Sequence, residues 1–171
     1  FIYKFVLNFN SKNIIVYTAL IGENEGLNKQ PYFKDSQIKH VCLTDNKNLK
    51  SNDWEIIQVE RILPGDPHRS QRNCKLRPHL FFPNYKYSLY IDNTVVLKSD
   101  TESFIKYILN QNEFDENSEY LSIPFHSFRD NLISEFNECS NLNLDNDSKL
   151  QEQLYYYLSI NSEILKQKPY W

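Results

Sequence analysis

The feature that most constrains the fold is a short apolar segment that runs into a carboxylate, at residues 87–92 (Tyr-Ser-Leu-Tyr-Ile-Asp). A run of strand-forming residues that is bounded by turn formers is typical of a strand buried on both faces. Such strands belong to parallel sheets, and open α/β sheets bind their ligands at the carboxyl ends of the strands. The segment therefore predicts a buried strand with Asp92 at the ligand-binding edge of a sheet.

Four other segments have the composition of strands, and several between and after them have that of helices. The expected strands cover residues 13–20, 39–43, 54–59 and 120–124. Helices are expected at residues 67–80, 101–110, 129–138 and 148–159. In the first of these, Asp66 can cap the helix with Pro67 in its first turn, and Pro78 predicts a kink or two short helices. Strands that alternate with helices predict an α/β layer fold with a largely parallel sheet.

Size and composition exclude several classes of function. The 171 residues suit one domain, and a net charge of −3 gives no charge-based attraction to nucleic acid or to a membrane surface. No apolar run approaches the roughly 18 residues of a membrane span. The three cysteines are far apart, which is typical of reduced thiols, and with no secretory pattern we expect a cytoplasmic protein. Because no polar tail precedes Trp171, we expect a single domain over residues 1–171 that is truncated at its C-terminus.

The first two predicted strands end at residues suited to a nucleotide. Thr18 and Ala19 precede a loop that contains Gly22, and small residues let a ligand approach the backbone amides. An ordinary strand-to-helix turn would have the same sequence. The second strand leads to Asp45, whose carboxylate can accept hydrogen bonds from a base or from ribose hydroxyls. Asp45 could equally form an Asx turn.

Two interpretations also remain open for Asp92. As a hard oxygen ligand it can bind Mg²⁺ or Mn²⁺ and offset the charge of a diphosphate. Alternatively, Asp92-Asn93 suits the two-residue turn of a β-hairpin. The commonest form of the metal motif has a second acid two residues further on, and here Thr94 occupies that place.

Basic and imidazole side chains complete the candidate site. Arg72 and Lys75 lie three residues apart, so on a helix they share a face and can contact a diphosphate, although a solvated basic face would look the same. His126 would emerge at the end of the 120–124 strand as a metal ligand or base, and Arg129 could bind a phosphate or the acceptor. A hydrogen-bonded structural histidine is the alternative for His126. His40, His68 and His79 have weaker cases.

Taken in order, these landmarks resemble a known family. It is the glycosyltransferase-like domain of the plant turgor-regulation-defect and mucilage-related proteins and their bacterial relatives, formerly a domain of unknown function. The resemblance lies in residues 16–22, 42–45, Trp54, 66–69, Arg72, Lys75, 81–83, 87–92, 125–126, Arg129 and Glu135. The sequence Gly-Glu-Asn-Glu at residues 22–25 departs from the Gly-x-Tyr-Asp that members often show after the first strand.

The resemblance implies a GT-A-like (Rossmann-like) three-layer fold with a mostly parallel central sheet. It implies a hexosyltransferase-like glycosyltransferase that moves a sugar from a nucleotide-diphospho-sugar to a glycan or other hydroxyl acceptor, assisted by Mn²⁺ or Mg²⁺. Thr18, Ala19 and Gly22 would then lie at the nucleotide, with Asp45 near the base. Arg72 and Lys75 would face the diphosphate, and Asp92 would be the first acid of the metal motif. A non-catalytic nucleotide- or glycan-binding module, or a nucleotidyltransferase, are the alternatives.

Overall fold

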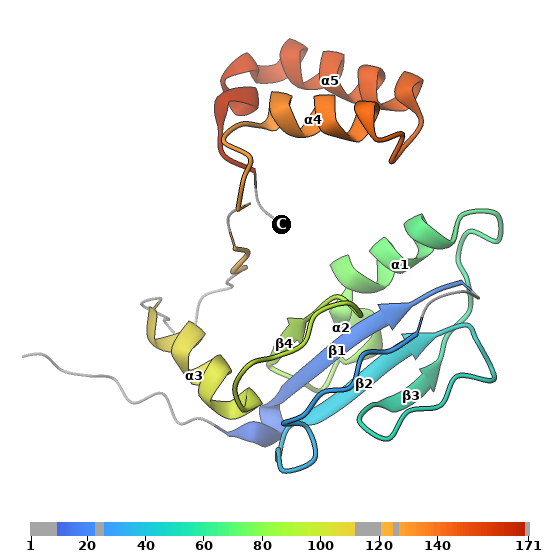
Figure 1. Ribbon diagram of the computed structural model, residues 1–171, viewed down its shortest axis with the longest axis vertical. Coiled ribbons are helices and arrows are strands. Elements are labelled where there is room, and N and C mark those ends of the chain that lie inside the picture. Colours follow the sequence, from blue (N-terminus) through green and yellow to red (C-terminus); the bar gives the residue numbers. More distant parts are fainter. Residues whose placement is uncertain (1–9, 23–25, 112–120, 125–126, 170–171) are drawn as a thin grey trace, which may run out of the picture. The chain divides into compact units, whose positions relative to one another are not determined.

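The computed structural model describes residues 10–22, 26–111, 121–124 and 127–169. The chain forms two compact units, Phe1–Phe114 and Asp115–Trp171 (Figure 1). The first unit holds a four-stranded sheet in the order β3-β2-β1-β4, and every neighbouring pair is parallel. The strands are β1 (Ile14–Leu20), β2 (Lys39–Thr44), β3 (Glu55–Gln58) and β4 (Tyr87–Tyr90). These four strands confirm the predictions at residues 13–20, 39–43, 54–59 and 87–92.

Every residue of β1 is buried, because this strand has a neighbour on each side and a covered face above and below. Ile15, Tyr17 and Ala19 face a cluster that contains Cys74 of α1 (Pro67–Leu76) and Phe82, which directly follows α2 (Pro78–Phe81). The alternate residues Ile14, Val16 and Leu20 face the other side of the sheet. The segment before β2, through Phe33, covers that side together with Ile105 of α3 (Thr101–Gln111). The sheet is thus the middle of three layers, and the predicted Rossmann-like α/β fold is confirmed.

Local sequence signals set the helix boundaries in this unit. The Asp66 side chain accepts a hydrogen bond from the Arg69 N–H at 2.9 Å, and Pro67 occupies the first turn of α1. Pro78 begins α2, because a residue without an N–H cannot continue α1 but fits a first turn. Asp100 accepts a bond from the Ser103 N–H at 2.8 Å at the start of α3. Of the two outcomes predicted at Pro78, a kink or two short helices, the structure has two short helices.

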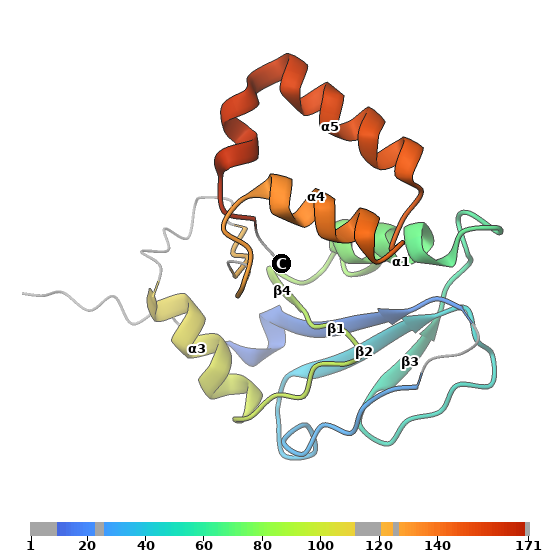
Figure 2. The same cartoon turned by 45° about the horizontal axis from the view of Figure 1, so that its top comes forward.

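The second unit contains α4 (Leu132–Asn141) and α5 (Asp147–Asn161), which lie side by side in Figures 1 and 2 and are followed by the 3₁₀ helix η2 (Ser162–Lys166). The Asn131 side chain accepts a hydrogen bond from the Ser134 N–H at 2.8 Å, so α4 begins three residues later than the sequence predicts. Another 3₁₀ helix, η1 (Ser11–Asn13), directly precedes β1 in the first unit. No helix of the described residues is both long and apolar enough to cross a membrane.

The predicted strand at residues 120–124 is wrong for residues 121–124. These four residues are exposed and pair with no strand, and Leu121 keeps 85% of its surface in contact with solvent. A short apolar segment becomes a strand when burial and ladder hydrogen bonds offset its ordering, and neither is present here. Tyr120 lies outside the described residues.

Candidate functional site

The order of the strands in the sheet by itself indicates where a ligand would bind. From β1 the chain moves to β2 and β3 on one side, whereas β4 pairs with the opposite edge of β1. The carboxyl ends of β1 and β4 therefore flank a topological switch point, where open α/β sheets bind their ligands. The connection that precedes β4 contains α1, which lies against β1. The space between α1 and the end of β4 is therefore the expected ligand site.

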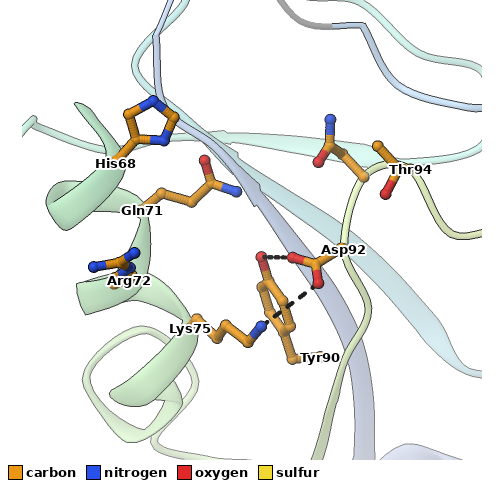
Figure 3. A pocket seen from close by; sticks show the side chains of 8 residues that line it. His68, Gln71, Arg72, Lys75, Tyr90, Asp92 and Thr94 are labelled. Atoms are coloured by element: carbon orange, nitrogen blue, oxygen red, sulfur yellow. Dashed lines mark hydrogen bonds and ion pairs between the residues drawn. The ribbon is translucent and has the colours of Figure 1, made fainter. Parts of the chain in front are cut away.

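A cavity of about 290 Å³ lies at this place (Figure 3). One wall is α1, whose lining residues are spaced i, i+3, i+4 and i+7 and so share one helix face. The other wall is the end of β4 and the turn that follows it. The lining residues are His68, Gln71, Arg72 and Lys75 from α1, and Tyr90, Asp92, Asn93 and Thr94 from the second wall. The predicted common face of Arg72 and Lys75 is confirmed, and both residues lie in the same cavity as Asp92.

The Asp92 carboxylate is held from both oxygens. The Tyr90 hydroxyl donates to Oδ1 at 3.0 Å, and the Lys75 Nζ lies 3.5 Å from Oδ2. The same ammonium lies 4.8 Å from the centre of the Tyr90 ring, within the range of a cation–π contact. About half of the Asp92 side chain remains exposed, which leaves the carboxylate accessible from the cavity.

The hairpin interpretation of Asp92-Asn93 is wrong. The Val95 N–H donates to the Asp92 carbonyl at 2.9 Å, so these residues do form a turn. However, residues 95–97 do not return as a strand, and among the described residues β4 pairs with β1 alone, in parallel. The sequence at Asp92-Asn93 therefore correctly predicts a turn. Because β4 pairs in parallel with β1, this turn does not connect two strands of a hairpin. It directs the Asp92 side chain toward α1 (Figure 3).

Two tyrosines hold the two walls of the cavity in place. The Tyr17 hydroxyl, from the central strand, donates to the Lys75 carbonyl at 2.8 Å and so fastens the end of α1 to the sheet. The rings of Tyr17 and Tyr90 meet edge to face, with their centres 5.2 Å apart. Burial raises the pKa of Tyr90; a hydrogen bond with Gln71 lowers it less, and the charge of Asp92 raises it further. Tyr90 therefore stays a protonated donor toward Asp92 at neutral pH.

The charge of the cavity lining favours an anion. Arg72 and Lys75 bring two cations, whereas Asp92 is the single acid among the lining residues. Arg69, on the same helix, does not line the cavity and lies 3.4 Å from Asp66 instead. A diphosphate matches a pair of cations on one helix face, because each can form charge-assisted hydrogen bonds to phosphate oxygens.

Asp45 lies at the end of β2 but does not line this cavity. Its Oδ1 accepts from the Gly22 N–H at 3.0 Å, and its Oδ2 accepts from the Arg61 Nε at 2.7 Å. Desolvation raises the pKa of Asp45, but the bonds from Gly22 and Arg61 lower it more, so that the pKa lies below its usual value. Asp45 therefore ties together the chain segments that leave β1 and β3. Its role beside a nucleotide base stays a prediction.

The predicted residues at the end of β1 are also separate from the cavity lining. Thr18 and Ala19 are fully buried within the sheet. Gly22 has a φ of +118°, a conformation that favours glycine, and a Cβ added there would lie 3.5 Å from Pro67. It thus lets the chain turn close to the start of α1. Of the predicted nucleotide-sugar site, the structure brings Arg72 and Lys75 together with Asp92, and brings Gly22 together with Asp45.

The last two predicted residues follow the first unit in the sequence. His126 lies outside the described residues. Arg129 belongs to the second unit, where its guanidinium lies 3.2 Å from Glu135 and 3.3 Å from Glu138. Both partners are residues of α4, so Arg129 helps to hold the segment before that helix. Its role toward a phosphate or an acceptor stays a prediction.

The sequence did not assign five of the lining residues to the site: His68, Gln71, Tyr90, Asn93 and Thr94. Two of them carried a usable signal. His68 lies four residues before Arg72, and Gln71 lies four residues before Lys75, which is the spacing of a single helix face. Tyr90 and Asn93 flank Asp92, but a strand and a turn give no spacing rule that assigns them to a ligand.

The residues present fit a divalent cation only in part. No group of three or more His, Cys, Asp or Glu side chains within the described part of the chain is placed to hold a metal ion. The accessible donors beside Asp92 include the Thr94 hydroxyl, and carboxylate and hydroxyl oxygens are the hard ligands that Mg²⁺ prefers. Mg²⁺ sites often combine one or two carboxylates with substrate phosphates and water. Asp92 fits that arrangement, with the phosphates of a ligand as the remaining donors.

The fold and the cavity define a class: an α/β protein with a Rossmann-like parallel sheet and a basic pocket at its switch point. The family model described as "TOD1/MUCI70, glycosyltransferase-like domain" matches residues 9–166, and the chain belongs to this family. No curated protein and no solved structure gives a significant match. The resemblance predicted from the sequence is confirmed, and at a coarse level the family indicates glycosyl transfer, with a sugar donor and an acceptor as partners.

Proposed function

We propose that this protein transfers a sugar from a nucleotide-diphospho-sugar to a hydroxyl group of a glycan or other acceptor. The observation that carries the proposal is the cavity at the switch point, which Arg72 and Lys75 of α1 line together with Asp92; the Lys75 side chain extends toward Asp92 (Figure 3). Family membership supports the class of reaction, and the two cations that line the cavity support its use by the charged part of the donor.

The reaction requires stabilisation of a leaving group. The acceptor oxygen bonds to the anomeric carbon, the bond from that carbon to the phosphate oxygen breaks, and the proton of the acceptor hydroxyl passes to water or to the departing diphosphate. Negative charge grows on the departing diphosphate, and fixed cations that contact it lower the barrier. Arg72 and Lys75 would have this role. Asp92 would hold Mg²⁺ or Mn²⁺ together with phosphate oxygens, and the cation would offset further charge.

One observation favours a second candidate, a binding module without turnover. Asp92 is the single carboxylate of the cavity lining, and its Oδ2 already faces Lys75. A site that binds a diphosphate by its cations alone would need no metal and no chemistry. The two candidates differ in product formation, because only the transferase releases a nucleoside diphosphate from the donor.

A thermal-shift panel of nucleotide-sugars, with and without Mn²⁺ or Mg²⁺, tests the proposal. A specific donor at a hundredfold excess over its dissociation constant should stabilise the fold by about 2.7 kcal/mol. The transferase is expected to show a shift that grows with metal, and Asp92→Asn should remove that growth. Stabilisation without metal dependence and without release of nucleoside diphosphate would favour the binding module. No stabilisation by any nucleotide-sugar would contradict both.

A further inference from the structure

We propose that Lys75 exchanges partners when the donor binds, from the Asp92 carboxylate to the donor diphosphate, and so couples binding of the diphosphate to binding of a divalent cation. This inference rests on the proposed function, because it takes a diphosphate and a cation as the ligands of the cavity. Lys75 is then a positioning residue for the metal site as well as a contact of the phosphate.

Both oxygens of the Asp92 carboxylate have partners. Oδ1 accepts from the Tyr90 hydroxyl at 3.0 Å, and Oδ2 lies 3.5 Å from the Lys75 ammonium. Mg²⁺ binds a carboxylate oxygen at about 2.1 Å. A divalent ion at Oδ2 would therefore lie only a few ångströms from the Lys75 ammonium, and the two positive charges would repel. Lys75 and the cation thus compete for one oxygen.

The geometry also shows which part of Lys75 is able to move. Its backbone is fixed, because the Tyr17 hydroxyl donates to its carbonyl at 2.8 Å. Its side chain is about one third exposed and lines the cavity, so the ammonium can leave Asp92 without entering the core. The four-carbon stem of lysine is flexible, and its ammonium is a point charge without a required direction. The exchange therefore needs a side-chain rotation only.

A diphosphate in the cavity would offer the ammonium a new partner. Arg72 precedes Lys75 by three residues on the same helix face, so both cations reach the same ligand. Once the ammonium binds a phosphate oxygen, Oδ2 of Asp92 becomes available to the cation. Before the diphosphate arrives, the ion pair keeps the affinity of Asp92 for a free cation low. The charge of Lys75 therefore makes the diphosphate bind before the cation.

The experiment measures Mn²⁺ binding to the protein alone, with free Mn²⁺ followed by electron paramagnetic resonance. Removal of the competing ammonium in Lys75→Met should tighten Mn²⁺ binding about tenfold, from loss of the ion pair and of the repulsion. Lys75→Arg keeps the charge and should resemble the wild type. Lys98→Met is the matched control, because Lys98 is exposed and does not line the cavity. It changes net charge equally and should leave Mn²⁺ affinity unchanged.

A second titration uses inorganic pyrophosphate without any metal. Lys75→Met should bind it about tenfold more weakly, while Lys98→Met should match the wild type. Thermal melts show that each variant is folded, and Lys75→Gln replaces Lys75→Met if the latter is not.

The exchange, the metal site and the proposed function would each be contradicted by a different result. Unchanged Mn²⁺ affinity in Lys75→Met, with loss of Mn²⁺ binding in Asp92→Asn, would overturn the exchange but leave the metal site. Mn²⁺ binding that does not depend on Asp92 would overturn both. No binding of pyrophosphate to the wild type would contradict the proposed function itself.

Discussion

Lowering the pH from 7 to 5 should destabilise the first unit through His40. This residue of β2 is buried, and its ring stacks on Phe33 with the ring centres 3.5 Å apart. Its Nε2 lies 3.1 Å from the Thr101 hydroxyl, a hydrogen bond that the neutral ring can make. Burial lowers the pKa of His40 from 6.5 to about 4, and the charge of Glu102 opposes this only weakly. The fold therefore favours the neutral imidazole.

The sign and size follow from proton linkage. Because the pKa is lower in the fold than in the unfolded chain, the unfolded state binds more protons below pH 6.5 and stability falls as the pH falls. Between pH 7 and pH 5 the loss from this residue is about 2 kcal/mol, and it approaches about 3 kcal/mol below pH 4. The full contribution is present above pH 6.5.

Urea unfolding at pH 7 and pH 5 measures this loss. Fluorescence of Trp54 reports on the first unit, since Trp54 is buried there, and a Trp171→Phe background removes the other tryptophan. His40→Gln cannot titrate, so the difference between the two proteins isolates His40 from the carboxylates. We expect the histidine protein to lose about 2 kcal/mol more than the glutamine variant. An equal loss in both would refute the reasoning.

Two further predictions concern the elements that hold the cavity. Tyr17→Phe removes the donor to the Lys75 carbonyl and should lower the free energy of unfolding by about 1–2 kcal/mol, measured in urea; no change would mean that the bond does not form. Gly22→Ala places a side chain at a φ of +118° and should cost about 1–3 kcal/mol. Gly65→Ala has open space and is the control, expected within about 0.5 kcal/mol of the wild type. Equal melting temperatures for the two glycine variants would contradict the assigned backbone strain.

The sequence predicts the sheet well because its strands are set by local composition. The apolar β1 needs no knowledge of its partners, and the Asp66-Pro67 and Pro78 signals locate two helix starts by backbone chemistry alone. Residues 121–124 show the limit of this reasoning. Their composition also suits a strand, but strand formation depends on a pairing edge that the local sequence does not encode.

The candidate site likewise contains features that the sequence predicts and features that depend on long-range contacts. The common face of Arg72 and Lys75 follows from helix geometry, so it was predictable. Whether Asp92 belongs to a hairpin or to a ligand site depends on β4 pairing with β1, which lies about 70 residues earlier in the chain. The sequence did not predict the bonds that Asp45 makes in the structure, because its partners Gly22 and Arg61 lie 23 and 16 residues away. A spacing rule could not identify those partners.

The central claim is that α1 and the Asp92 turn together form a diphosphate site, and paired arginine variants test it most directly. Arg72 lines the cavity, whereas Arg69, on the same helix and of the same charge, does not. Calorimetric titration with inorganic pyrophosphate should show that Arg72→Ala weakens binding by about tenfold or more, the loss expected for a charge-assisted hydrogen bond. Arg69→Ala should leave the affinity within about twofold of the wild type, since Arg69 does not line the cavity and its Nε lies 3.4 Å from the Asp66 carboxylate. Equal losses in the two variants, or no loss in Arg72→Ala, would contradict the assignment of this cavity.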